Sequence, residues 1–202
     1  MIGVKVLGDN GSGAYSDVIA GIEWVKQQAN VSGRSSVINC SLGGPQSEAL
    51  NTVVRSAITA GGRYLVAMSS AISHTGSDSQ LDLVHFVAAA GNSAADASGT
   101  SPANEQNIVT VGAVDSSNKM ASFSNFGSVV DVFALGVNVK AAFIGSPQTT
   151  RNLSGTSMSS PAVAGTLAVE LSKYGKTSPA ALQNSLKQNA KAVVTGQPSG
   201  TT

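Results

Sequence analysis

SGTSMSSPAVAG, residues 154–165, carries the most informative pattern of this sequence. Its first half holds small residues and glycine, and an apolar helix of about four turns is supplied by Met158, Val163, Leu167, Val169 and Leu171. Pro161 falls in the first turn, where its missing N–H breaks no hydrogen bond and its fixed φ already suits a helix. The stretch therefore predicts a buried helix that begins near Ser157.

Ser157, at the start of this helix, has two interpretations. A serine at such a position commonly caps the helix, because its side-chain oxygen accepts a hydrogen bond from a free backbone N–H. The same position places the hydroxyl at the positive end of the helix dipole, beside N–H groups that stabilise an oxyanion. The stretch alone leaves both the helix cap and the nucleophile open.

Strands and helices alternate along the rest of the sequence. Helices are predicted to begin after Ser16, Ser47 and Ser178, because serine is a common helix cap and Pro179 suits the first helical position. Gly61 is predicted to end the second of them as a left-handed cap. Apolar, β-branched runs predict buried strands at residues 4–7, 36–42, 84–89, 108–114 and 129–133. This alternation is typical of an α/β fold, a mostly parallel central sheet with helices on both faces.

The composition fits a single globular domain and excludes several classes of function. The 202 residues are 42% hydrophobic and 11% charged, with a formal net charge of +1, so no basic field exists for nucleic acid or an anionic membrane. No apolar run is long enough to span a bilayer, and no signal peptide is expected ahead of the strand at residues 4–7. Cys40 is predicted to be a buried, unreactive thiol, and two histidines are too few for a zinc site.

Residues 62–83 do not fit the alternation of strands and helices. They separate Gly61 from Val84 by 22 residues, whereas such connections usually take about 2–6. We expect them to be an insertion foreign to the fold, either a retained intervening sequence or an ordinary surface-loop insertion. Residues 195–202 are rich in Gly, Pro, Ser and Thr and are predicted to form a frayed tail.

Four further segments accompany the serine stretch: GVKVLGDNGSGAYS at residues 3–16, VINCSLGG at 37–44, FVAAAGN at 86–92 and SFSNFG at 122–127. Together the five segments resemble the subtilisin-like serine proteases (peptidase family S8), in particular their proteinase K-like branch. One segment alone would be a weak signal, but all five occur in the family's order along almost the whole chain. The resemblance implies a partial peptidase domain over residues 1–202, a subtilisin-like α/β fold that is incomplete at its N-terminus. It also implies a serine endopeptidase that works through an acyl-enzyme.

The resemblance assigns the catalytic residues. It makes Ser157 the nucleophile, and it makes Asn92 the residue whose side-chain amide holds the oxyanion together with the backbone N–H of Ser157. Without the resemblance, Asn92 reads as an asparagine in a turn after Gly91. The family's aspartate and histidine, in Asp-Ser/Thr-Gly and His-Gly-Thr motifs, are expected upstream of residues 3–16. This sequence is therefore expected to lack both and to be inactive alone.

One aspartate and two histidines precede Ser157 in the order Asp, His, Ser of the family's catalytic triad, but none of them stands in the family's motif. Asp9 belongs to the segment that is similar to the family's substrate-edge loop, and His74 lies within residues 62–83 with its motif letters reversed. His85 lies on a predicted strand and is expected to be structural. None of them is expected to act as the base for Ser157.

The resemblance implies that an extended polypeptide substrate binds by strand addition between two edges of the fold. The residues of these edges are Gly11, Ser12 and Gly13 on one side and Ser41, Leu42, Gly43 and Gly44 on the other. Tyr15 is expected to wall a more distant substrate pocket. Four small residues are expected to line the primary specificity pocket and to leave room for a large apolar side chain: Ala88, Ala89, Ala90 and Gly91.

Calcium is the one cofactor that the resemblance implies. Its ligands would be the carboxylate of Asp131 and the backbone carbonyls of Gln106 and Ile108, since calcium prefers oxygen ligands. Asp131 is equally well explained as a polar residue that closes a strand. The resemblance further implies an extracellular enzyme, and a monomer is expected.

Other classes of function stay open beside the protease. A non-catalytic, peptide-binding pseudoprotease would keep both substrate edges and lack hydrolysis. An esterase of the α/β-hydrolase type needs Gly-x-Ser-x-Gly, and Ser159 stands where its second glycine belongs, which argues against it. A partial gene product that does not fold alone would leave buried sheet edges unpaired and would melt with poor cooperativity.

Overall fold

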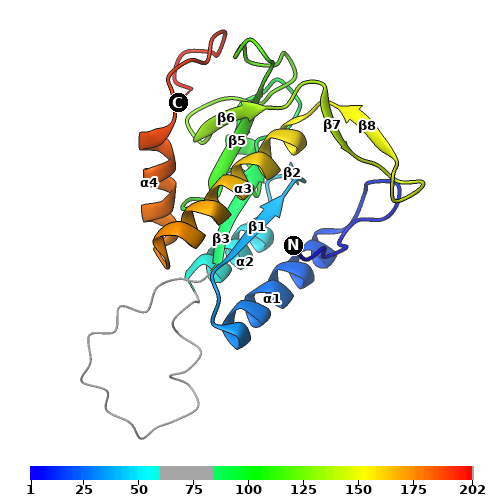
Figure 1. The fold of residues 1–202 in the computed structure, drawn as a ribbon, viewed down its shortest axis with the longest axis vertical. Helices are drawn as coiled ribbons and strands as arrows, with labels where there is room; N and C mark the ends of the chain where they lie inside the picture. Colours follow the sequence, from blue (N-terminus) through cyan, green and yellow to red (C-terminus); the bar gives the residue numbers. More distant parts are fainter. Residues whose placement is uncertain (60–83, 202) are drawn as a thin grey trace, which may run out of the picture.

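A computed structural model describes residues 1–59 and 84–201 of the chain. Its centre is a four-stranded sheet in which each neighbouring pair of strands is parallel. The strand order is β1 (Ser36–Cys40), β3 (Val84–Ala89), β5 (Val109–Val114) and β6 (Val132–Leu135) (Figure 1). Strands of such a sheet are covered on both faces, which agrees with the apolar, β-branched sequences of β3 and β5.

Helices cover both faces of this sheet, so the predicted α/β fold class is confirmed. On one side lie α1 (Tyr15–Ser32) and α2 (Glu48–Thr59), and on the other α3 (Thr156–Tyr174) and α4 (Pro179–Asn189) (Figure 1). Alternate residues of β3 divide the core between the two sides. Phe86 and Ala88 pack in a hydrophobic cluster with residues of α1 and α2, and Val87 packs in a second cluster with residues of α3 and α4.

The helix predicted from the serine stretch is α3, which begins at Thr156, one residue before Ser157. Val163 and Leu167 are 7% and 1% exposed and pack this helix against the sheet. The predicted helix after Ser178 is also present, because the Ser178 hydroxyl accepts a hydrogen bond from the N–H of Ala181 at 3.2 Å.

Two short antiparallel pairs of strands were not predicted. β2 (Gly44–Pro45) pairs with β4 (Thr100–Ser101), and β7 (Val139–Ala142) pairs with β8 (Thr150–Leu153) (Figure 1). A short 3₁₀ turn, η2 (Ala97–Gly99), leads into β4. The chain passes from β8 almost directly into α3, so the β7–β8 pair leads the chain into the helix that carries Ser157.

The predicted strand at residues 4–7 is not formed. Val6 packs partly against α1, but Val4 is 38% exposed, and a buried parallel strand needs cover on both faces. The segment instead satisfies polar groups locally, because the Lys5 ammonium binds the Leu7 carbonyl and the Asp9 carboxylate. The apolar run therefore lies beside the core rather than in the sheet.

Four predicted boundaries were also wrong. β1 ends at Cys40 rather than at residue 42, and β5 begins at Val109 rather than at residue 108. α1 begins at Tyr15 rather than after Ser16, because the carbonyl of Ala14 already accepts the first helical hydrogen bonds. β6 begins at Val132 rather than at residue 129. Val130 is fully buried, but its N–H closes a turn onto the Gly127 carbonyl at 3.1 Å, which shows that a buried apolar residue need not be in a strand.

Residues 60–83 lie outside the described residues, as does residue 202. The predicted helix end at Gly61, the predicted insertion at residues 62–83 and His74 therefore have no structural outcome. The tail that was predicted to fray is held at two described points. The carbonyl of Thr195 accepts a hydrogen bond from the N–H of Met120 at 2.8 Å, and the Thr201 hydroxyl accepts one from the N–H of Gly127 at 3.2 Å.

Cys40 is buried, as predicted, and burial raises the pKa of its thiol to about 12. Since the thiolate is the reactive form, Cys40 is inert near neutral pH. None of the described helices combines the length and the apolar character that crossing a membrane requires.

His85 on β3 makes the stability of the fold depend on pH. It is 2% exposed, neither ring nitrogen has a partner among the described residues, and burial lowers its pKa from 6.5 to about 4. As the pH falls, His85 therefore takes up a proton at a higher pH in the unfolded chain than in the folded chain. Above pH 6.5 this histidine does not change the free energy of unfolding, and as the pH falls from 6.5 toward 4 it lowers that free energy. The loss at pH 4 is about 3 kcal/mol.

The variant His85→Leu should lose this part of the acid dependence. Urea unfolding of the parent and the variant at pH 7.5, 5.5 and 4 measures it, and the difference between the two proteins removes the contribution of the carboxylates. Equal pH dependence in both proteins would show that His85 is protonated without cost.

Candidate active site

Ser157 lies in the first turn of α3, against the carboxyl end of β1. Its hydroxyl donates a hydrogen bond to the backbone carbonyl of Ser41 at 3.1 Å. The hydroxyl of Ser41 donates in return to the backbone carbonyl of Ser157 at 2.9 Å. These reciprocal bonds join the serine stretch to the segment that follows β1, although 116 positions separate the two residues.

Asn92 follows the end of β3 and contacts the residue next to Ser157. Its side-chain oxygen Oδ1 accepts two hydrogen bonds from Thr156, one from the backbone N–H at 2.8 Å and one from the hydroxyl at 3.0 Å. Because both donors come to Oδ1, the amide group is held in one orientation with Nδ2 at its other end. Asn92 is exposed, and among the described residues Nδ2 has no recorded hydrogen-bond partner. The structure thus presents an unused N–H donor beside Ser157.

Thr156 was not singled out from the sequence, but it is central to this arrangement. Its side chain is fully buried, and its hydroxyl also accepts a hydrogen bond from the N–H of Gly91 at 3.2 Å. The hydroxyl therefore connects the backbone before Asn92 with the Asn92 side chain. The signal that could have found it is the conjunction of Gly-Thr-Ser with a helix start, since a buried hydroxyl requires a partner.

Asn125 holds the loop that carries Asn92. Its Nδ2 donates to the carbonyl of Ala90 at 2.9 Å, and its Oδ1 accepts from the N–H groups of Ser93 and Ala95 at 2.9 and 3.2 Å. Gly91 has a φ of 108°, and a side chain on it would collide with the Asn125 amide. This explains why Asn125 lies in one of the recognised segments, SFSNFG, and why glycine precedes Asn92.

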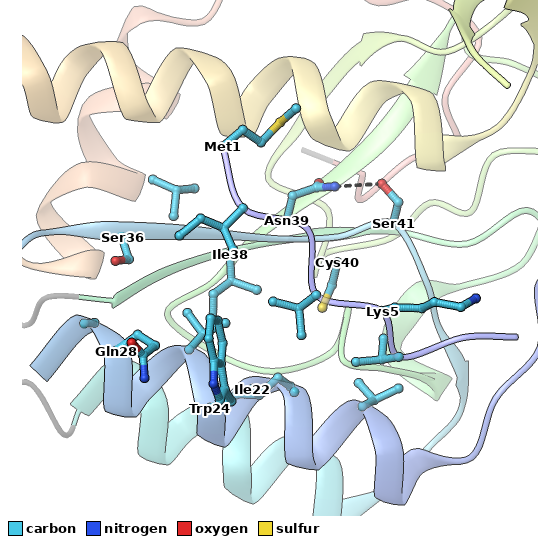
Figure 2. Close-up of a pocket in the computed structure, with 18 of the residues that line it drawn as sticks. Met1, Lys5, Ile22, Trp24, Gln28, Ser36, Ile38, Asn39, Cys40 and Ser41 are labelled. Carbon is cyan, nitrogen blue, oxygen red and sulfur yellow. Dashed lines mark hydrogen bonds between the residues drawn. The ribbon is translucent and has the colours of Figure 1, made fainter. Parts of the chain in front are cut away.

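A second chain of hydrogen bonds supports Ser41 from the side of β1. The hydroxyl of Ser160, which is fully buried, donates to Asn39 Oδ1 at 2.6 Å. Asn39 Nδ2 donates to the hydroxyl of Ser41 at 2.9 Å (Figure 2). The start of α3 is thereby bonded to β1 at Ser160 and to the residue that follows β1 at Ser157.

No histidine contacts Ser157 among the described residues. The Ser157 hydroxyl bonds to a carbonyl, and both nitrogens of the buried His85 ring are without a partner. Asp9 lies on the surface, where the hydrogen bond from Lys5 lowers its pKa. His74 lies outside the described residues.

Tyr15, which was predicted to wall a distant substrate pocket, lies against Gly44 of the second predicted substrate edge. The Tyr15 hydroxyl donates to the carbonyl of Pro45 at 2.6 Å, and the space where Gly44 would carry a side chain is filled by the Tyr15 ring. Gly44 also pairs with Ser101 in the short sheet of β2 and β4. The glycine-rich turn of the first edge is exposed, with Gly11 at a φ of 77°.

The four residues predicted to line the specificity pocket lie in and after β3. Ala88 and Ala90 are fully buried and Ala89 is 4% exposed, while Gly91 is partly exposed. The assignment of a specificity pocket to these residues stays a prediction.

Of the three residues predicted to bind calcium, Asp131 and Ile108 already accept hydrogen bonds from protein groups, and no such bond is found for the Gln106 carbonyl among the described residues. Gln183 donates to the Ile108 carbonyl at 2.6 Å and to Asp131 Oδ1 at 2.9 Å, and the Lys187 ammonium reaches the same Oδ1 at 3.1 Å. Asp131 Oδ2 accepts from the N–H of Thr110 at 2.9 Å. As they lie, these residues do not fit a calcium ion, because Lys187 supplies the positive charge and Gln183 fills the space between the oxygens.

Removal of Lys187 tests this arrangement. We expect Lys187→Ala to lower the free energy of unfolding by about 1–3 kcal/mol, because Asp131 is only 10% exposed and loses a charged donor. The exposed Lys191, changed to Ala, is the matched control and should cost almost nothing. EDTA should leave the melting temperature of the parent unchanged, and a marked decrease with EDTA would show that calcium binds in spite of Lys187.

Comparison with known proteins places this geometry in a family. The chain matches the subtilase family, peptidase S8, over residues 1–201. It is 46% identical over 186 residues to a subtilisin-like protease 2 of Pseudogymnoascus destructans, which covers 92% of this chain and 40% of that protein. It is 40% identical over 201 residues to a cuticle-degrading serine protease of Arthrobotrys oligospora, which covers 99% of this chain and 42% of that protein.

A solved structure gives the same result at the level of the fold. The crystal structure of a cold adapted subtilisin-like serine proteinase matches with a TM-score of 0.81 and 39% sequence identity, over 98% of this chain and 63% of that one. The chain therefore spans less than two thirds of the relatives that it matches. From the match over nearly all of its length and from the shared fold, the chain belongs to the subtilase family of serine peptidases.

Proposed function

We propose that this chain carries the nucleophile and the oxyanion-binding part of a subtilisin-like serine endopeptidase, with Ser157 as the nucleophile. The observation that carries the proposal is the fixed side chain of Asn92. Thr156, the residue before Ser157, holds Oδ1 of that amide, so the Nδ2 donor stays free beside the helix start. A preorganised donor of this kind stabilises the negative charge of a tetrahedral intermediate.

The reaction that fits these groups is acyl transfer from a peptide bond. The Ser157 Oγ forms a bond to the carbonyl carbon of the substrate, and the carbonyl oxygen becomes an oxyanion that accepts hydrogen bonds from Asn92 Nδ2 and the Ser157 N–H. The C–N bond then breaks, and the amine leaves with the proton that Ser157 lost. Water later releases the acyl group from Ser157.

A general base must take the serine proton and pass it to the amine, and the described residues offer Ser157 no such base. In the subtilisin-like pattern, a histidine oriented by an aspartate has this role, and both are expected in the part of the relatives outside the match. A triad protease that lacks these groups loses about 10⁶ in turnover. The isolated chain should therefore hydrolyse peptides too slowly to detect.

The substrate would be an extended polypeptide that adds as a strand between residues 11–13 and residues 41–44. The contact of Tyr15 with Pro45 supports this assignment, because these residues follow the two edges in the sequence and their hydrogen bond holds the edges near each other. The family resemblance suggests an extracellular enzyme. A protein that joins this chain to the missing catalytic groups would therefore be an extracellular monomer, and it would bind neither nucleic acid nor membrane.

A chimera tests the proposed function, because the rest of a related proteinase would supply the base that the described residues do not give Ser157. Residues 1–201 of this chain replace the matched region of the cold adapted proteinase, with and without residues 62–83. The chimera should hydrolyse casein while the isolated chain does not. A folded chimera without activity, in both forms, would contradict the proposal, and so would rapid hydrolysis by the isolated chain.

A pseudoprotease that binds peptides is the second candidate. The observation that favours it is that the described residues give Ser157 no base, since the Ser157 hydroxyl bonds to the Ser41 carbonyl. Fluorescence anisotropy of a labelled, extended apolar peptide would show binding by the isolated chain, and a chimera that binds this peptide without cleaving it would favour this candidate over the peptidase.

A further inference from the structure

The backbone carbonyl of Ser157 lacks its usual partner in α3. In an α-helix each carbonyl accepts a hydrogen bond from the N–H four residues later, and four residues after Ser157 stands Pro161, which has no N–H. Because α3 begins at Thr156, Pro161 is its sixth residue and lies inside the helix. Contrary to the expectation for a proline in the first turn, its missing N–H therefore leaves one helical carbonyl, that of Ser157, to find another donor.

The Ser41 hydroxyl is this donor. It reaches the Ser157 carbonyl at 2.9 Å from the segment that follows β1. A proline ring also crowds the carbonyl four residues before it, which favours a carbonyl that tilts out of the helix toward such an external donor. The peptide group after the proposed nucleophile is thus held by Ser41 in place of residue 161 of its own helix.

Asn39 fixes the direction of the Ser41 hydroxyl. Asn39 Nδ2 donates to Ser41 Oγ at 2.9 Å, and Figure 2 shows both side chains pointing toward α3, the pale yellow helix. A hydroxyl has a single proton to donate. Since Ser41 Oγ accepts from Asn39, it keeps that proton for the Ser157 carbonyl. Without Asn39 the hydroxyl would be free to rotate.

Ser160 in turn fixes the amide of Asn39. The fully buried Ser160 hydroxyl donates to Asn39 Oδ1 at 2.6 Å. Because Oδ1 takes this bond, Nδ2 is directed to the opposite side, where Ser41 lies. The chain of hydrogen bonds starts in α3 at Ser160, crosses to β1 and returns to α3 at Ser157.

Only one of the two bonds between Ser41 and Ser157 is able to persist during the proposed reaction. The Ser157 hydroxyl donates to the Ser41 carbonyl at 3.1 Å, and this bond is lost when Oγ gives up its proton and attacks. The bond from the Ser41 hydroxyl to the Ser157 carbonyl involves neither Oγ nor its proton. It is therefore the bond that holds the backbone of the nucleophile throughout the reaction.

We propose that Asn39 is a positioning residue for the nucleophile: through the Ser41 hydroxyl it holds the Ser157 carbonyl that Pro161 leaves without a helical partner. The proposal rests on the proposed function, because it gives Asn39 a role in the reaction at Ser157. Holding this carbonyl fixes the rotation of the Ser157 backbone, and with it the directions of Oγ and of the N–H that binds the oxyanion. A misplacement of about 1 Å at such groups costs roughly 100-fold in rate.

Two substitutions of Asn39 in the chimera test this role. Asn39→Ala should lower kcat about tenfold or more and change KM little, because the groups that act in the transition state are misplaced while the substrate edges remain. Asn39→Asp keeps the size of the side chain and the acceptor for Ser160. Its carboxylate accepts the Ser41 proton, however, and so takes the hydroxyl away from the Ser157 carbonyl. It should lower kcat as much as Asn39→Ala does.

A double-mutant cycle shows whether Asn39 acts through Ser41. Ser41→Ala removes the hydroxyl, so the further change Asn39→Ala should lower kcat no more, because both changes break the same chain of bonds. Asn189→Ala is the matched control, since its Nδ2 donates to the Ser185 carbonyl at 2.9 Å in α4, and it should keep the kcat of the parent. Effects of Asn39→Ala and Ser41→Ala that multiply would overturn the proposal, and so would a rise in KM at constant kcat.

A measurement that needs no activity separates this proposal from the proposed function. Ser157 and Met158 form the one Ser-Met pair of the sequence, so ¹³C-carbonyl serine with ¹⁵N methionine selects the Ser157 carbonyl in an NMR spectrum of the isolated chain. Asn39→Ala and Ser41→Ala should both shift this resonance upfield, because the carbonyl loses its hydrogen bond, and Asn189→Ala should not.

The outcomes are distinguishable. A Ser157 carbonyl resonance that Asn39→Ala leaves in place would overturn the positioning proposal, and so would a shifted resonance with an unchanged kcat in an active chimera. A parent chimera without activity would contradict the proposed function alone, because the resonance still tests the link from Asn39 to Ser157.

Discussion

Ser157→Ala in the chimera is expected to lower kcat for peptide hydrolysis by about 10⁶, which is the loss seen when a triad nucleophile is removed. The reason is that no other group can form the acyl-enzyme. The Ser157 hydroxyl is bonded only to the Ser41 carbonyl among the described residues, so its loss should leave the surrounding backbone in place. The measurement is the turnover of a chromogenic peptide, with circular dichroism as a check of folding.

The neighbouring Ser154 supplies the matched control. It lies in the same stretch, is exposed, and accepts a hydrogen bond from the N–H of Asn138 at 3.0 Å. Ser154→Ala should keep the activity of the chimera. An activity of Ser157→Ala within tenfold of the parent would mean that Ser157 is a helix cap, the other interpretation of its position.

Asn92→Ala is expected to lower kcat by about 10²–10³ and to change KM little. The amide would donate to an oxygen that becomes charged only in the transition state, so its removal should not weaken substrate binding. The exposed Asn152 of β8, changed to Ala, is the matched control and should change neither constant. A rise in KM at constant kcat would show that Asn92 only binds the substrate.

Much of the fold could be predicted from local patterns. The β-branched runs of β3 and β5, the serine cap of α4 and the spacing of apolar residues in α3 each follow from interactions within a few residues. Residues 4–7 carry the same kind of pattern and yet form no strand. Their pattern shows a preference for extended backbone, but whether a neighbouring strand takes up the hydrogen bonds depends on the rest of the molecule.

The candidate site shows the same difference between what local sequence patterns predict and what depends on contacts across the fold. Ser157 and Asn92 stand in recognisable motifs, so they could be named from the sequence. Thr156, Asn125 and Gln183 were missed, because their partners lie far away in the chain and a hydrogen bond across the fold leaves no local pattern. Lys187 was missed for the same reason, although its bond to Asp131 decides how the predicted calcium site is filled.

The central proposal is that Ser157 is a nucleophile whose general base does not lie among the described residues. A fluorophosphonate probe measures it directly, because the probe forms an Oγ–P bond and loses fluoride only at an activated serine. We expect no labelling of the isolated chain and labelling of the chimera at Ser157, located by mass spectrometry and lost in Ser157→Ala. Labelling of the isolated chain at Ser157, or of an active chimera at another residue, would contradict it.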